Sequence, residues 1–248
     1  MLHLSVEHSK LNINTLSLYL LINLLSISIP FVVSFDKRIQ LMRDWKSLIL
    51  ALVISSIPYL MWDVYFTEQG YWGFNPIYLS GTYLFNLPIE EVLFFICIPF
   101  ACIFTHISIL KIRPFKLKKK TSKYISITIL VLAALLLITN LDKAYTVWVM
   151  VFVLVIQGIA LLYFKELLSH FLITFLFMLI PFIIVNGALT GFGIPDEVVW
   201  YNNNQNFGLR FITIPLEDFF YAYSLILLNL IVFKVLSKNQ SLEYSSNS

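Results

Sequence analysis

The chain has 248 residues, of which 59% are apolar and 12% are charged, and its mean hydropathy is +0.83 with a formal net charge of +3. This composition places the chain among integral membrane proteins and excludes an ordinary soluble domain. Its two cysteines, Cys97 and Cys102, and its four histidines have no spacing typical of a disulfide or a metal site, so neither is predicted.

Apolar runs long enough to cross a bilayer occur seven times along the chain. A membrane-spanning helix needs about 20 mostly apolar residues. The runs predict helices near residues 13–33, 47–66, 87–109, 124–140, 144–163, 168–188 and 212–234. The sequence therefore predicts an all-α integral membrane protein with about seven transmembrane helices.

Lysine and arginine divide unequally between the two sides of these helices. Of the 17 such residues, only Lys10, Lys143 and Arg210 fall on one side, whereas the basic loop at 111–123 lies on the other. Because cytoplasmic loops carry the excess of positive charge, we expect a multi-pass protein of the cell membrane with its N-terminus outside and its C-terminus in the cytoplasm. We interpret the basic loop as a contact with anionic membrane lipid and not with nucleic acid.

The sequence Pro-x-Glu-acid occurs twice, at 88–91 and 215–218, each time where an apolar run begins. It belongs to a longer duplication. The series Pro58, Asp63, Thr67 and Gly70 recurs 123 residues later, as Pro181, Asn186, Thr190 and Gly193, and the pair Phe74-Asn75 recurs 127 residues later, as Tyr201-Asn202. Self-similarity at a nearly fixed offset indicates one structural unit used twice.

This duplication predicts two three-helix repeats. We place the first repeat at 1–112, a basic cytoplasmic loop and linker helix at 113–143, and the second repeat at 144–240. Four helices separate equivalent points, so the chain returns to the same side of the membrane and the repeats are parallel. Both acid motifs are then expected at the non-cytoplasmic surface, where they form one shared pocket or two facing half-sites.

The four motif carboxyls, Glu90, Glu91, Glu217 and Asp218, are the candidate catalytic groups. Acids at the edge of the hydrocarbon are costly and commonly functional, and a carboxylic acid kept neutral beside an apolar cavity can donate a proton. Adjacent residues point about 100° apart on a helix, so one acid of each pair faces any given point. We favour Glu90 and Glu217 as donors or proton-return groups, tuned by their neighbours. The alternative role is structural, because Pro and Glu also suit the first turn of a helix.

Two aromatic residues are candidate supporting groups. Phe94 and Tyr221 follow Glu90 and Glu217 by four residues and share a helix face with them. Their ring faces can stabilise a cation, although aromatic residues also form belts at membrane interfaces.

Several polar residues are further candidates. Asp63 and Asn186 occupy equivalent positions, and we expect Arg210 to pair with Asp63 or with an acid motif. Asn75 and Asn202 are expected to orient the carboxyls by hydrogen bonds or to cap turns.

The pattern resembles the small membrane lycopene cyclases, which occur as two short subunits or as one fused chain. In the first repeat the matching stretches are Trp62-Asp63 through Phe66-Thr67, Trp72-x-Phe74-Asn75 and Pro88-Ile-Glu90-Glu91. In the second repeat they are Asn186-Gly187 through Thr190-Gly191, Tyr201-Asn202 and Ile214-Pro215-Leu-Glu217-Asp218. The resemblance covers nearly the whole chain except its termini and the linker helix, in the order of the fused form, and it adds Trp72 to the candidate residues.

This resemblance implies an enzyme that cyclises the acyclic end groups of lycopene, or of a related acyclic carotenoid, to β-ionone rings without net redox change. Such an intramolecular lyase or isomerase forms γ-carotene and then β-carotene after an acid protonates the terminal double bond. The chain has no Gly-x-Gly-x-x-Gly fingerprint, and no cofactor is implied. Other enzymes of the carotenoid pathway are further candidate partners.

Two alternatives remain open. A carotenoid hydratase forms the same cation but captures it with water, so its product gains oxygen. A proton-coupled transporter also suits parallel repeats and intramembrane acids, but it leaves the pigment unchanged. A prenyltransferase is disfavoured, because the Asp-rich clusters that bind Mg²⁺ and diphosphate are missing.

Overall fold

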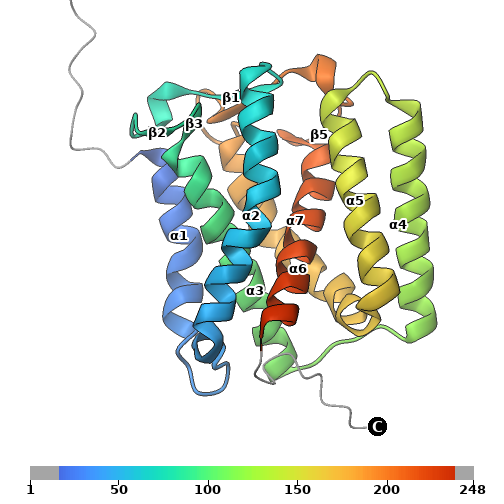
Figure 1. Cartoon of the computed structure of the whole chain (residues 1–248). Coiled ribbons are helices and arrows are strands. Elements are labelled where there is room, and N and C mark those ends of the chain that lie inside the picture. Colours follow the sequence, from blue (N-terminus) through green and yellow to red (C-terminus); the bar gives the residue numbers. More distant parts are fainter. Residues whose placement is uncertain (1–16, 238–248) are drawn as a thin grey trace, which may run out of the picture.

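The computed structural model describes residues 17–237, and within them the chain forms a bundle of seven α-helices (Figure 1). In chain order the helices are α1 (Leu18–Val33), α2 (Trp45–Glu68), α3 (Ile89–Ile112), α4 (Lys119–Thr139), α5 (Ala144–Tyr163), α6 (Lys165–Leu189) and α7 (Leu216–Leu236). Six of them, α2 to α7, are long and apolar enough to cross a membrane, whereas α1 is a shorter apolar helix of 16 residues. The predicted all-α membrane fold is therefore confirmed.

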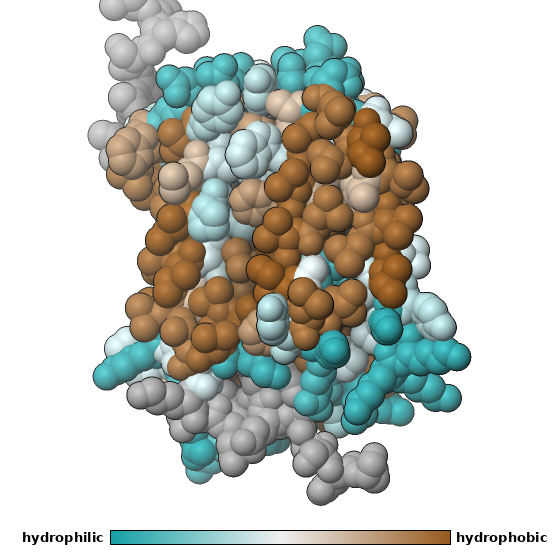
Figure 2. Space-filling view, turned by 45° about the vertical axis from the view of Figure 1, so that its right-hand side comes forward, coloured by the Kyte–Doolittle hydropathy of each residue, from teal (hydrophilic) through white to brown (hydrophobic). Residues whose placement is uncertain are grey.

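The surface has the polarity that a bilayer requires. Figure 2 shows a broad hydrophobic belt across the middle of the visible face, with hydrophilic residues at both ends. Large apolar side chains of the long helices are exposed, as Met61 of α2 (70%) and Ile184 of α6 (68%) illustrate. Exposed apolar surface on this scale marks contact with lipid in a chain whose helices can span a membrane.

Short strands gather at one end of the bundle and connect the helices there (Figure 1). They are β1 (Trp72–Phe74), β2 (Tyr83–Leu84), β3 (Leu87–Pro88), β4 (Val199–Tyr201), β5 (Arg210–Phe211) and β6 (Ile214–Pro215), with 3-10 turns at Leu41–Asp44, Pro76–Tyr78 and Asn203–Gln205. These strands were not predicted, because runs of two or three residues show no periodicity. The helix expected from 212 consequently begins at Leu216, after β6.

The pairing of β1 with β4 reveals how the two repeats are related. The strands are antiparallel, and the central pair joins Gly73 to Trp200, residues that lie 127 positions apart. The flanking backbone bonds are equivalent too: Asn75 N donates to Val198 O (2.9 Å) and Asn202 N donates to Tyr71 O (2.8 Å). An antiparallel pair centred on equivalent residues implies a local two-fold axis, so the repeats α1–α3 and α5–α7 face each other across it.

Helix packing follows the same pairing. Within the repeats α1 packs on α3 and α5 packs on α7, and between them α2 packs on α7 and α3 on α6. The linker helix α4 lies at the edge of the bundle against α5 (Figure 1). The basic connection between α3 and α4 is at the opposite end from the strands, which agrees with the predicted separation of charge.

Candidate functional site

Each acid motif is held at the start of a helix by the hairpin before it. The tips of the β2–β3 and β5–β6 hairpins are Phe85 (φ 57°) and Ile212 (φ 61°), two bulky residues in the left-handed region and again 127 positions apart. Pro88 and Pro215 then end the hairpins and precede α3 and α7. The fixed backbone of Pro and the positive end of the helix dipole both favour acids in the turn that follows.

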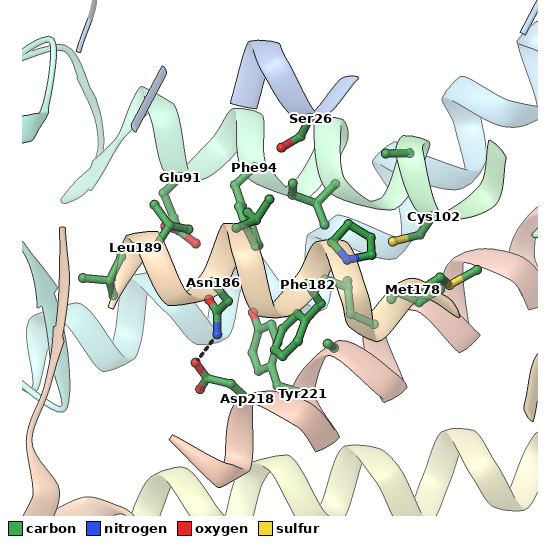
Figure 3. Close-up of a pocket in the computed structure, with 18 of the residues that line it drawn as sticks. Ser26, Glu91, Phe94, Cys102, Met178, Phe182, Asn186, Leu189, Asp218 and Tyr221 are labelled. Carbon is green, nitrogen blue, oxygen red and sulfur yellow. Dashed lines mark hydrogen bonds between the residues drawn. The ribbon is translucent and has the colours of Figure 1, made fainter. Parts of the chain in front are cut away.

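A cavity of about 370 Å³ lies directly beside these helix starts. Its wall is mostly apolar and is formed by α1, α2, α3, α5, α6 and α7 with strands β1 and β4. Three carboxyl groups reach it, those of Asp63, Glu91 and Asp218. Figure 3 shows Glu91, Asn186 and Asp218 near one end of the cavity and Cys102 and Met178 near the other. Residues from both repeats therefore contribute to a single cavity.

Asp63 and Glu91 form a carboxyl pair on one wall. Trp72 Nε1 donates to Asp63 Oδ1 (2.6 Å), and the Tyr19 hydroxyl donates to Glu91 Oε2 (2.5 Å). The two acids are also close enough to influence each other's ionisation. Asp63 Oδ2 is buried and no donor group in residues 17–237 reaches it. Because two neighbouring buried carboxylates repel each other, a proton on one of them stabilises the pair.

Asp218 has a different environment. Tyr145 donates to Oδ1 (2.5 Å), while Asn186 Nδ2 (2.7 Å) and the Tyr201 hydroxyl (3.1 Å) donate to Oδ2. Burial and the neighbouring Asp218 raise the pKa of the Tyr201 phenol well above its ordinary value, so Tyr201 remains a donor. Three donors around one carboxyl group suit the ionised form, which accepts and does not donate.

Glu90 and Glu217 are directed away from the cavity. Glu90 Oε1 accepts from the Ser17 hydroxyl (2.7 Å) and from Ser80 N (2.6 Å). Glu217 Oε1 likewise accepts from the Thr146 hydroxyl (2.8 Å) and from Phe207 N (2.6 Å). Both side chains are 0% exposed and neither lines the cavity. The bonds from Ser80 and Phe207 attach the preceding loop to the helix, and those from Ser17 and Thr146 connect it to the start of α1 and to α5. Glu91 and Asp218, and not the favoured Glu90 and Glu217, are the motif acids that reach the cavity.

The expected aromatic residues do line the cavity. Phe94 lies beside Tyr19, with ring centroids 6.3 Å apart, and Tyr221 packs against Trp62 at 5.2 Å. Trp72, which holds Asp63, is also part of the wall. Rings thus surround the space next to the acids.

The expected ion pair of Arg210 with Asp63 or an acid motif is wrong. Arg210 donates to Thr213 O (2.7 Å) and to Asn203 Oδ1 (3.1 Å), and its guanidinium lies 5.7 Å from the centre of the Tyr201 ring. The hairpin carries Arg210 to the surface, and the indole of Trp72 takes the place at Asp63.

The two asparagines of the loops do not touch the carboxyls. Asn75 Oδ1 accepts from Ile77 N (3.2 Å) and Asn202 Oδ1 accepts from Asn204 N (3.0 Å). Both therefore cap 3-10 turns, the second of the two roles expected for them. Asn186, by contrast, meets Asp218 directly.

Sequence reasoning missed the tyrosine donors. Tyr19 and Tyr145 lie 126 residues apart and donate to Glu91 and Asp218 in equivalent ways. The duplication would have identified them, because both tyrosines lie at equivalent positions in the first helix of each repeat. Within residues 17–237 we found no cluster of three or more His, Cys, Asp or Glu side chains able to hold a metal ion.

Comparison with known families agrees with the duplication. A family model described as lycopene cyclase matches the chain twice, over residues 16–109 and 142–236. Each match contains one acid motif and spans the three helices of one repeat, apart from the last three residues of α3. Searches of curated proteins and of solved structures returned no match.

Proposed function

We propose that this chain, which belongs to the lycopene cyclase family, is a lycopene β-cyclase that converts the acyclic ends of lycopene to β-ionone rings. The reaction is an isomerisation without net redox change, so it needs a proton donor, a proton acceptor and a dry site. The observation that carries the proposal is that three carboxyl groups, those of Asp63, Glu91 and Asp218, line one mostly apolar cavity.

The first step is proton donation by the Asp63–Glu91 pair. A proton held by the pair adds to the terminal double bond of the substrate, and the electron pair of that bond forms the new C–H bond. A tertiary carbocation results, and the pair is left with one more negative charge. General acid catalysis of this kind contributes about 10²–10⁴-fold to a rate.

Ring closure and proton loss complete the reaction. The nearby internal double bond attacks the cation and forms the carbon–carbon bond of the ring, which moves the positive charge to a ring carbon. The positively charged ring carbon lies next to the carbon that has just formed the new bond. Loss of a proton from that neighbour places a double bond between the two carbons and yields the β-ring. We assign this proton to Asp218, because its three donors favour the carboxylate before the reaction.

The cavity favours cyclisation over capture of the cation by water. The rings of Phe94, Trp72 and Tyr221 border the space beside the acids, and aromatic faces attract positive charge. The remaining wall is mostly apolar, so few groups can hold water near the cation. This argues against the hydratase alternative, in which a positioned water is the nucleophile.

Expression in a lycopene-accumulating host tests the proposal. The wild-type chain should convert lycopene to cyclic carotenoids of unchanged mass, detected by chromatography with mass spectrometry. An oxygenated product would indicate a hydratase, and unchanged lycopene would contradict an enzyme of this class.

Neighbouring acids provide matched variants. Glu91→Gln removes a carboxyl group from the pair and should lower ring formation by roughly 10²–10⁴-fold. Glu90→Gln keeps an oxygen for the Ser17 and Ser80 donors and should leave most of the activity. Equal activity of the Glu91→Gln variant and the wild type would refute the assignment of the pair.

A further inference from the structure

The local two-fold axis implies a second space on the other side of the bundle, equivalent to the cavity. Residues of α6 that line the cavity correspond to residues of α2 at an offset of 123, and residues of α1 correspond to residues of α5 at 126. The cavity wall contains Ser26, Phe182 and Val185. In the other repeat these three positions are occupied by Phe152, Tyr59 and Trp62, respectively.

These larger side chains fill the equivalent space. The ring of Phe152 lies 4.9 Å from that of Tyr59 and 5.1 Å from that of Trp62, measured between centroids. Tyr221, which lines the cavity, packs against Tyr59 at 5.1 Å, whereas Tyr59 itself does not line it. Tyr59 is 0% exposed and Trp62 is 5% exposed. In addition, α2 packs more extensively on α7 than α6 packs on α3. The space lined by α1 and α6 is therefore an open cavity, whereas the equivalent space beside α5 and α2 is filled by aromatic side chains.

The open cavity is too small for a whole carotenoid. Along α6 it extends from Leu189 to Met178, which corresponds to roughly 16 Å of helix. An extended chain advances about 1.1–1.2 Å per bond, so the approximately 30 bonds of a carotenoid main chain reach roughly 35 Å. The volume of about 370 Å³ is also near the lower end of the range for small-molecule sites. Only one end of the polyene can lie inside.

The remainder of the polyene must therefore lie in the membrane. Leu25 and Ile29 of α1 both line the cavity, yet they are 63% and 71% exposed. The cavity thus borders the lipid-facing surface at α1. Its acids lie at the end of the cavity that is next to the starts of α3 and α7.

We propose that the chain binds one end of a carotenoid at a time and releases the monocyclic product before the second end enters. This inference rests on the proposed function. The second ring, where one is formed, requires the molecule to leave, turn round and bind again through the same opening beside α1. A chain with two working half-sites would instead hold both ends or pass the substrate between them.

A time course with the purified full chain in liposomes tests this order. Lycopene is supplied in large excess over the enzyme, and the pigments are separated at early times. The monocyclic carotenoid should accumulate to many times the amount of enzyme before any bicyclic product appears. Bicyclic product formed from the start, with monocyclic product never exceeding the amount of enzyme, would overturn the inference while leaving the proposed function intact. Complete absence of rings would overturn the proposed function and this inference with it.

Two variants that copy the closed half-site test where binding occurs. Val185→Trp and Ser26→Phe introduce the residues of the equivalent positions and should each lower formation of the first ring roughly 100-fold, because the end group can no longer approach the acids. Ile184→Trp adds the same indole to the lipid-facing side of α6, where Ile184 is 68% exposed, and should stay within about twofold of the wild type. Elution of each variant as a single species of wild-type size excludes misfolding. If both cavity variants elute normally and cyclise at the wild-type rate, the cavity is not the binding site.

Discussion

One difference between the repeats, Asp63 in the first and Asn186 in the second, distinguishes the surroundings of the two acids Glu91 and Asp218 in the cavity. Each side chain is placed toward the second acid of a Pro-x-Glu-acid motif: Asp63 lines the same cavity as Glu91, and Asn186 donates to Asp218. A neighbouring buried carboxyl group favours a proton on one of the two acids, whereas an amide neighbour supplies a permanent donor. Environments that hold neighbouring acids in opposite protonation states are the usual basis of acid–base assignments.

Asp63→Asn tests this distinction while preserving the contacts. The new amide oxygen can accept from Trp72 Nε1 and the amide nitrogen can donate to Glu91, but the second carboxyl group, which favours a proton on the pair, is lost. Ring formation should fall by roughly 10²–10⁴-fold with little change in thermal stability.

Asp63→Ala is the matched comparison. It should be equally inactive but also less stable, by about 1–3 kcal/mol, since Trp72 Nε1 is left buried without a partner. Wild-type turnover in Asp63→Asn, assayed by pigment analysis, would show that the donated proton does not come from this pair.

At the level of residues, the sequence identified the motifs but not the direction of each side chain. The spacing predicted that one acid of each pair faces the site, and it could not tell Glu91 from Glu90. That choice depends on which side of α3 meets α1 and α6, which is a property of tertiary packing. Asp63 and Glu91 lie on different helices, so their proximity could not be predicted from a local sequence pattern either.

Among the elements, the β1–β4 ladder connects the two acid sites directly. Trp72 and Tyr201 are paired across this ladder, and they donate to Asp63 and Asp218 respectively. A ladder of three residue pairs thereby sets the positions of donors for both acids. Its strands were too short to predict, although the Trp72 and Tyr201 motifs at their ends were recognised.

Gly73 is the position at which this ladder is most sensitive. A Cβ atom there would lie 2.3 Å from Cζ2 of Trp200, and the flat indole covers the glycine backbone. Gly73→Ala should therefore separate the strands, cost about 1–3 kcal/mol of stability and reduce ring formation, as measured by thermal unfolding in detergent and by pigment analysis.

Gly158→Ala in α5 serves as the control for a glycine substitution. No atom lies within 4 Å of its added Cβ, and alanine favours a helix over glycine by about 1 kcal/mol. This variant should be as stable as the wild type or more so. Similar behaviour of the two alanine variants would contradict the role given to the ladder.

For the whole molecule, the sequence predicted the helical membrane fold and the duplication, because both depend on long apolar runs and fixed offsets. It left open whether the repeats form one pocket or two, since that depends on which side chains fill the equivalent spaces. Phe152 and Trp62 are ordinary aromatic residues in the sequence, and only their packing shows that one space is closed.

The orientation of the bundle in the membrane is a prediction at this scale. Ile77 lies at the end that carries the strands and is 79% exposed, whereas Lys118 is exposed at the opposite, basic end. We predict that the strand end faces away from the cytoplasm. In intact cells a membrane-impermeant thiol reagent should label Ile77→Cys, and it should label Lys118→Cys only after permeabilisation. The wild type, whose Cys97 is buried and Cys102 partly buried, is the background control, and the reverse labelling pattern would invert the assigned topology.

The origin of the hydrogen that enters the ring tests the chemistry most directly. Enzyme equilibrated in D₂O, and present in excess over lycopene in liposomes, should deliver a deuteron from the Asp63–Glu91 pair to the terminal double bond. The carbon that receives it becomes part of the ring and does not exchange, so mass spectrometry should find one deuterium for every ring formed. Rings without deuterium would show that the hydrogen comes from elsewhere and would contradict proton donation by these acids.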